Sequence, residues 1–180
     1  MKGKNLVFLI GFMGSGKTTV GRLLAEKMGT AFYDTDSLIE GKARMKIPEI
    51  FQKKGESYFR VLERKILNEI IENRSGSPAV ISTGGGMPCF GDNLSLMKEG
   101  GIVVYLKVPV SDIIKRIDDA DKRPVFKRQL KGDLFRNVEE LLKAREPYYL
   151  SSDIIVDNSS GKTPFTVVTE ILEEIKKFRR

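Results

Sequence analysis

The sequence contains no histidine, and Cys89 is its one cysteine among 180 residues. The lack of histidine excludes a Ser-His-Asp triad, a histidine general base and a zinc site with histidine ligands. A single cysteine excludes an intrachain disulfide and a metal site with several cysteine ligands, which is typical of a reducing compartment. Any proton transfer must therefore use carboxylates, lysine, tyrosine or water.

Long hydrophobic runs are also lacking. None approaches the about 18 apolar residues that a membrane span needs, and a glycine-rich segment interrupts the first run too early for a secretory signal. We therefore expect a cytoplasmic chain that forms one domain over residues 1–180. The 31 lysine and arginine residues exceed the 24 acidic ones, and the resulting charge of +7 favours an anionic partner.

Short apolar segments alternate with segments of helical period along the chain. Strands are predicted over residues 5–10, 31–33, 79–82, 102–107 and 153–156, and helices over 16–28, 56–72 and 163–178. Such alternation indicates βαβ units, and hence a three-layer α/β/α fold with a five-stranded parallel sheet. The charged segment 117–132 predicts an irregular loop between two helices, either a disordered excursion or a mobile lid.

Residues 11–18 match the phosphate-binding pattern G-x-x-x-x-G-K-[ST], between an apolar strand and an amphipathic helix. The glycines let backbone N–H groups turn toward a phosphate, and the helix N-terminus adds a positive dipole. Lys17 supplies a charge for the outer phosphates, and the hydroxyl of Thr18 is a ligand that Mg²⁺ accepts. The alternative is a glycine-rich turn before a helix.

Asp34 and Asp36 follow the second predicted strand, at the edge where open α/β sheets bind ligands. At this spacing on an extended chain, both carboxylates are expected to point to the same side, one near Mg²⁺ and the other near an attacking hydroxyl. The alternative is local, because Ser37 and Glu40 have the spacing of a capping box and Asp36 favours a helix start.

Three consecutive glycines, residues 84–86, follow the third predicted strand. They predict either a backbone that approaches another group closely, such as a substrate, or a tight turn. Arg60, Arg123 and Arg145 are candidate ligands for an anion, although a single surface arginine is more often solvated. Cys89 lies just past the glycines, either near a substrate or as a small buried thiol.

The motifs together resemble those of the shikimate kinase family in order and spacing, over essentially the whole chain. They are residues 11–18, Asp34-Thr35-Asp36, Phe59-Arg60, residues 84–86, Arg123-Pro124 and Arg145. The resemblance implies a fold like that of the nucleoside monophosphate kinases with a mobile lid. It also implies Mg²⁺-dependent transfer of the γ-phosphate of ATP to the 3-hydroxyl of shikimate, toward chorismate and the aromatic amino acids. Such phosphoryl transfer depends on positioning and charge, and needs no histidine.

The same resemblance implies a role for each motif residue. ATP would be held by Gly14, Ser15, Gly16, Lys17, Thr18 and Thr19, with Arg116 and Lys162 at the adenine and Arg123 at the transferring phosphate. Thr18 would bind Mg²⁺, with Asp34 and Ser82 assisting through water. Shikimate would be held by Asp36, which is also the candidate base, by Arg60 and Arg145 at its carboxylate, and by the backbone of Gly84, Gly85 and Gly86.

Two other functions stay open at this point. The first is another small-molecule kinase of the same architecture, acting on gluconate or a nucleotide, but an acceptor without a carboxylate leaves Arg60 and Arg145 without a partner. The second is a nucleotide-dependent nucleic-acid-binding module, which the charge of +7 favours. Against it, the basic tail 176–180 has one aromatic residue and no nucleic-acid motif appears. We therefore expect a monomer that binds ATP and shikimate, with no nucleic acid and no membrane.

Overall fold

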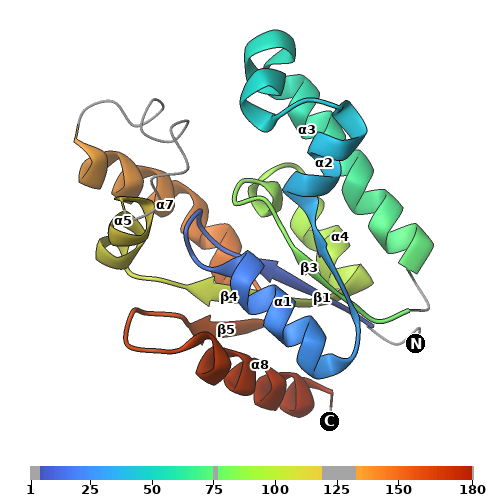
Figure 1. Ribbon diagram of the computed structural model, residues 1–180, viewed down its shortest axis with the longest axis vertical. Helices are drawn as coiled ribbons and strands as arrows, with labels where there is room; N and C mark the ends of the chain where they lie inside the picture. The colour runs from blue at the N-terminus through green and yellow to red at the C-terminus, as the bar shows by residue number, and fades with distance from the viewer. Residues whose placement is uncertain (1–4, 75–76, 119–132, 180) are drawn as a thin grey trace.

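The computed structural model describes residues 5–74, 77–118 and 133–179. It contains one sheet of five parallel strands in the order β2-β3-β1-β4-β5 (Figure 1). The strands are β1 (Leu6–Ile10), β2 (Ala31–Asp34), β3 (Ala79–Ser82), β4 (Gly101–Lys107) and β5 (Ile154–Asp157). The predicted five-stranded parallel sheet is confirmed, and each predicted strand agrees to within one residue at either end.

Helices cover both faces of this sheet, which confirms the three-layer architecture. On one face lie α1 (Lys17–Met28) and α8 (Pro164–Phe178). On the other lie α2 (Thr35–Ala43), α3 (Ile47–Arg74), α4 (Asn93–Gly100), α5 (Val110–Asp118) and α7 (Leu134–Leu150), with the short 3₁₀ helix η1 (Met87–Cys89). The ribbon in Figure 1 shows α1 and α8 on the near side and α4 behind the strands.

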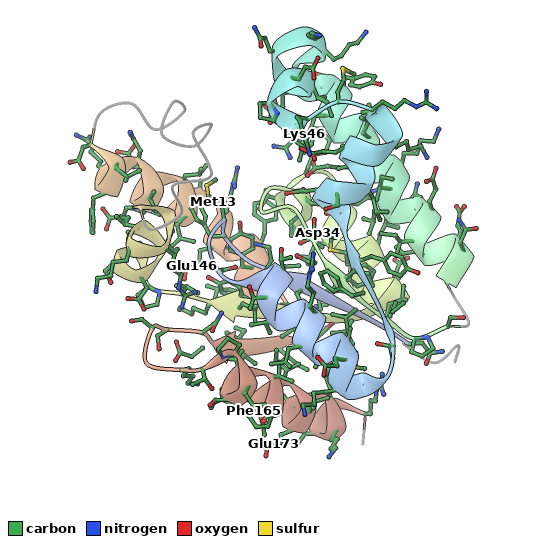
Figure 2. All side chains as sticks on the ribbon, viewed as in Figure 1. Met13, Asp34, Lys46, Glu146, Phe165 and Glu173 are labelled. Atoms are coloured by element: carbon green, nitrogen blue, oxygen red, sulfur yellow. The ribbon has the colours of Figure 1, made fainter. Side chains whose placement is uncertain are left out.

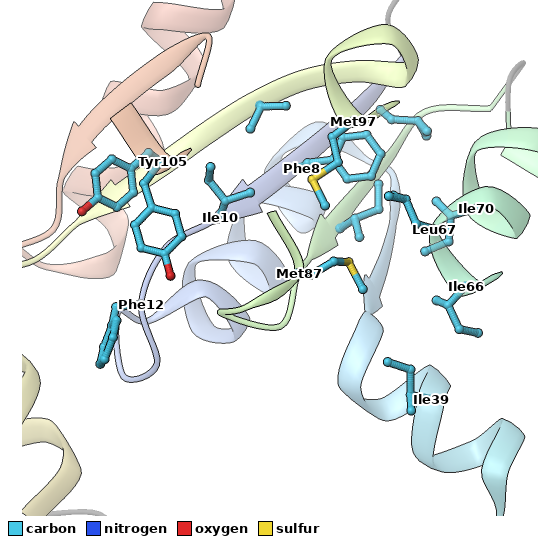
Figure 3. Close-up of a cluster of buried hydrophobic side chains, with 14 of the residues drawn as sticks. Phe8, Ile10, Phe12, Ile39, Ile66, Leu67, Ile70, Met87, Met97 and Tyr105 are labelled. Carbon is cyan, nitrogen blue, oxygen red and sulfur yellow. The ribbon is translucent and has the colours of Figure 1, made fainter. Parts of the chain in front are cut away.

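The central strand β1 is buried on both faces, as its continuous apolar sequence predicts. Leu6, Phe8 and Ile10 point into the core under α2, α3, α4 and α7, while Val7 and Leu9 point into the core under α1 and α8. Figure 3 shows Phe8 and Ile10 among the side chains of the first of these cores. This strand therefore fixes the position of the glycine-rich loop that follows it.

Two helices differ from the prediction. The long helix begins at Ile47 rather than residue 56, because its two helical halves join at Gly55, whose φ of 81° interrupts the period that the sequence shows. In α8, a period of apolar residues puts Phe165, Val168 and Ile171 on one predicted face, but only Val168 and Ile171 are buried, and Phe165 is 58 % exposed on the outside of the helix (Figure 2). Its ring contacts the ammonium group of Lys27 on α1 instead, at 5.1 Å from the ring centre.

The predicted lid over residues 117–132 lies outside the described residues, apart from the last two residues of α5. The single-domain organisation with a lid therefore stays a prediction. Within the described ranges, no helix combines the length and the apolar character needed to cross a membrane.

Candidate active site

The sheet order places the carboxyl ends of β1, β2 and β3 at one edge, beside the point where the strand order reverses. In open α/β sheets this is where ligands bind. The glycine-rich loop follows β1, Asp34 ends β2, and the glycines 84–86 follow β3. The topology thus brings together three motifs that are far apart in the sequence.

The loop between β1 and α1 has the conformation of a phosphate cradle. Gly14 and Gly16 have φ angles of 75° and 86°, in the left-handed region that favours glycine. Lys17 opens α1 and is 8 % exposed, and its ammonium group donates to the carbonyl groups of Gly11 and Phe12 at 2.9 Å. The charge of this lysine is therefore held over the loop, at the N-terminus of a helix.

The same loop is braced from the opposite half of the sheet. Asn158, just after β5, is 6 % exposed and donates to the carbonyl oxygen of Ser15 at 2.7 Å. Arg116 on α5 donates to the carbonyl oxygen of Asn158 at 2.7 Å and to that of Gly14 at 3.4 Å. No sequence motif predicts Asn158 at this loop. Arg116, which is expected at the adenine, lies beside the phosphate loop, and its role at the nucleotide stays a prediction.

Two further residues predicted at the nucleotide lie at the edge of this region. Thr19 is in the first turn of α1 and is exposed. Lys162 pairs with Glu170 of α8 at 2.7 Å and with Asp157 at 3.5 Å, so its ammonium group faces α8. Their roles at the nucleotide stay predictions.

Asp34 joins the loop to the next strand. Its Oδ2 accepts a hydrogen bond from the Thr18 hydroxyl at 2.9 Å, while Oδ1 accepts from the backbone N–H groups of Asp36 and Ser37 at 3.1 and 3.3 Å. Asp34 is therefore also the N-cap of α2 (Figure 2). In the sheet register, Asp34 is paired with Ser82, which is 2 % exposed.

The expected local structure around Asp34 and Asp36 is wrong in two respects. The two residues do not share an extended segment, because α2 begins at Thr35 and Asp36 lies in its first turn. Ser37 and Glu40 do not form a capping box, since Asp34 already caps α2 and Glu40 Oε1 accepts from the backbone N–H of Ile47 at 3.0 Å. Glu40 thus accepts a hydrogen bond from the first residue of α3 instead of capping α2.

The three glycines lie against charged side chains from three elements. A Cβ on Gly84 would lie 2.7 Å from Asp36 Oδ1 and 3.2 Å from Glu63 Oε1. A Cβ on Gly86 would lie 2.8 Å from a guanidinium nitrogen of Arg60. The prediction of a close approach is confirmed, and a turn is present as well, since the Met87 N–H donates to the Gly84 carbonyl at 3.1 Å.

Arg60 and Arg145 converge on the glycines from two helices. Arg60 of α3 is held by Glu63 at 2.6 Å and by Glu56 at 2.8 Å, and its side chain is 13 % exposed. Arg145 of α7 lies with a guanidinium nitrogen 3.7 Å from the Cβ position of Gly85, and over the ring of Phe12. Arg123, the third predicted arginine, lies outside the described residues.

Glu63 is a buried carboxylate that is not among the predicted site residues, and it is 1 % exposed. Its signal in the sequence is the i, i+3 spacing from Arg60 on a helix, which places two side chains on one face. Burial raises the pKa of Glu63 to about 7, against the opposing effect of Arg60, and the negative charge of Asp36 adds to the rise. This group therefore holds a proton over part of the neutral range.

We expect Glu63→Gln to change the pH dependence of folding. The pKa of Glu63 is about 7 in the folded chain and has its ordinary value of 4.5 when unfolded, so the folded state binds more protons between these values. The contribution of Glu63 to the free energy of unfolding is therefore fully present below pH 4.5. As the pH rises through about 7, this contribution is lost, and the free energy of unfolding falls by up to about 3 kcal/mol. Urea unfolding at several pH values should show this loss in wild type and in a Glu72→Gln control, but not in Glu63→Gln. Equal pH slopes in all three would contradict the assignment.

Comparison with known proteins gives matches over nearly the whole chain. A family model described as shikimate kinase matches residues 13–176. The shikimate kinase of Persephonella marina is 41 % identical over 170 residues, which are 94 % of this chain and 98 % of that protein. The shikimate kinase of Sulfurihydrogenibium sp. (strain YO3AOP1) is 43 % identical over 171 residues, or 95 % and 98 % of the two chains.

A solved structure agrees with these matches. The shikimate kinase from Acinetobacter baumannii in complex with shikimate superimposes with a TM-score of 0.86 at 35 % identity, covering 98 % of this chain and 95 % of that one. The likeness therefore extends over the sheet and both helical layers.

Proposed function

This chain belongs to the shikimate kinase family, whose members transfer a phosphoryl group from ATP to a hydroxyl of shikimate, and we propose how its residues perform that reaction. One observation carries the proposal. The Cβ position of Gly85 lies 3.3 Å from the backbone nitrogen of Met13 in the phosphate loop and 3.7 Å from Arg145. A single residue thus separates a phosphate cradle from an arginine suited to a carboxylate.

The nucleotide binds along the loop between β1 and α1. Backbone N–H groups of residues 14–19 hold the phosphates, and Lys17 places its charge on the outer ones. Arg116 and Lys162 contact the adenine. Thr18 and Asp34 fit Mg²⁺, because their oxygens lie 2.9 Å apart and this cation takes few protein ligands beside phosphates and water. When bound, Mg²⁺ neutralises charge on the phosphates, and Ser82 assists through water.

Shikimate binds on the other side of the glycines. Arg60 and Arg145 hold its carboxylate, because a guanidinium group matches a carboxylate with two parallel hydrogen bonds. Asp36 accepts hydrogen bonds from the hydroxyl groups and takes the proton of the 3-hydroxyl as the γ-phosphate is transferred. Arg123 contacts the transferring phosphate. The monomeric state, the cytoplasmic location and the lack of nucleic-acid binding stay predictions.

An acceptor panel tests the proposed function. ADP release is measured in a coupled assay with shikimate, gluconate and nucleoside monophosphates, each with ATP and Mg²⁺. We expect turnover that depends on shikimate, with the other acceptors near the background rate. No turnover above background with shikimate would overturn the proposal, and turnover with gluconate alone would favour the sugar-kinase alternative.

Arg60→Ala is expected to raise the KM for shikimate by about ten- to a hundredfold, since hydrogen bonds between charged groups contribute about 1.5–3 kcal/mol. The KM for ATP should change by less than about twofold, because Arg60 lies on the acceptor side of the glycines. Steady-state kinetics with each substrate varied measures both values. Arg64→Ala is the matched control, from the same helix but paired with Asp92. An unchanged shikimate KM in Arg60→Ala would count against its role.

A further inference from the structure

Tyr149 ties α7 to the glycine segment 84–86. Its side chain is 0 % exposed, and its ring lies 5.1 Å from that of Tyr105. The hydroxyl group donates a hydrogen bond to the carbonyl oxygen of Gly85 at 2.7 Å. Burying a hydroxyl is costly unless it is hydrogen-bonded, so this bond fixes the end of α7 against the turn after β3.

The same hydroxyl interacts with Arg145, four residues earlier on the same face of α7. Burial raises the pKa of Tyr149 well above its ordinary value, the charge of Cys89 raises it further, and the charge and hydrogen bond of Arg145 oppose the rise. A guanidinium nitrogen of Arg145 lies 3.7 Å from the Cβ position of Gly85, beside the carbonyl to which Tyr149 donates. Because a guanidinium group has no acceptor, Arg145 is the donor in its interaction with the phenolic oxygen. The hydroxyl therefore links the guanidinium group to the glycine backbone, and consecutive hydrogen bonds of this kind strengthen one another.

The bond to Gly85 also sets the direction of a backbone donor. The peptide bonds of the described residues are trans, so the N–H of Gly86 points to the side of its peptide opposite the Gly85 carbonyl. Because that carbonyl points at Tyr149, the Gly86 N–H points away from α7. Gly86 itself lies against Arg60, with 2.8 Å between its Cβ position and a guanidinium nitrogen.

We propose that Tyr149 is a positioning residue for the acceptor carboxylate. This role rests on the proposed function. The hydroxyl of Tyr149 holds the Arg145 guanidinium group and the Gly86 N–H so that both reach the carboxylate that Arg60 binds. Two of the three donors, from α7 and from the turn after β3, are thereby held by a residue that does not touch the substrate, while Glu56 and Glu63 hold the third, Arg60.

Tyr149→Phe tests this role, because it removes the hydroxyl and keeps the ring. We expect the KM for shikimate to rise about tenfold, with kcat and the KM for ATP within about twofold of wild type. Tyr148→Phe is the matched control, at the neighbouring position with 42 % exposure, and should leave all three constants unchanged. A purely structural role would lower the active fraction and hence kcat, with the shikimate KM unchanged. That result, or equal rises in both KM values, would overturn the proposal.

A modified acceptor separates this effect from a general loss of binding. With the methyl ester of shikimate, which lacks the carboxylate charge, Tyr149→Phe and wild type should have the same KM. A tenfold difference that persists with the ester would overturn the role at the carboxylate.

A measurement on the wild-type chain does not depend on the folding of any variant. In ¹⁵N-labelled protein the amide signal of Gly86 should shift when shikimate is added, and an unmoved signal would overturn the proposal. Different results contradict the proposed function and the role of Tyr149. Wild type without shikimate turnover contradicts the proposed function, whereas an active wild type with an unchanged shikimate KM in Tyr149→Phe contradicts only the role of Tyr149.

Discussion

Lys17→Met is expected to lower kcat by about a thousandfold, since charges aimed at a transferring phosphoryl group contribute about that much in related reactions. Lys17 is 8 % exposed, and its ammonium group is held at 2.9 Å by the carbonyl oxygens of Gly11 and Phe12. Its charge therefore stands over the loop before the nucleotide arrives, and little reorganisation is needed during the reaction. Methionine keeps a chain of similar length and removes the charge.

The matched control is Lys27→Met, on the same helix but at its far end, where the ammonium group lies over Phe165. It should leave kcat within about twofold of wild type. Circular dichroism and thermal unfolding of both variants check that the loop and α1 still fold. If folded Lys17→Met keeps more than about a tenth of the wild-type kcat, the charge of Lys17 is not central to the transfer.

The strands were predictable because their signals are local. A strand buried on both faces needs a continuous apolar run, and Leu6–Ile10 is one. The glycine-rich loop was predictable for the same reason, since positive φ angles at Gly14 and Gly16 restrict those positions to glycine or a strained residue. In both cases the residues that define the feature are neighbours in the chain.

Which of two neighbouring helices a carboxylate caps could not be predicted in the same way. Glu40 has the right spacing to cap its own helix at Ser37, yet its carboxylate accepts from the backbone N–H of Ile47. Asp34 takes over the cap of α2 because the strand β2 ends at that residue. Such a choice depends on how the chain turns between α2 and α3, and the spacing of residues does not contain that information.

The convergence of charged side chains depends on the order of the strands. Arg60 and Arg145 are 85 positions apart in the sequence, and they meet because α3 and α7 approach the same turn after β3. Glu63 is not predictable as a site residue, because a glutamate on a charged helix is usually solvated, whereas this one faces the glycines and is 1 % exposed. Its i, i+3 spacing from Arg60 predicts a residue of the site only when that face of α3 is known to be buried.

Asp36→Asn is expected to lower kcat by about a hundred- to ten-thousandfold, the usual contribution of a general base. Asp36 Oδ1 lies 2.7 Å from the Cβ position of Gly84, and the next residue, Gly85, lies against both the phosphate loop and Arg145. Asparagine has nearly the same shape but takes up no proton from the acceptor hydroxyl. Rapid-quench measurement of a single turnover isolates the transfer step from product release, and Asp92→Asn, at the start of α4, serves as a control with normal rates.

The same variant also tests the electrostatic coupling within the site. The negative charge of Asp36 contributes to the raised pKa of Glu63, so Asp36→Asn should lower that pKa below about 7. An NMR titration of the Glu63 carboxyl carbon measures this directly and needs no turnover. A normal rate of transfer in folded Asp36→Asn would remove Asp36 as the base. An unchanged Glu63 titration would show instead that the two carboxylates do not share the space above Gly84, because like charges that close must influence each other.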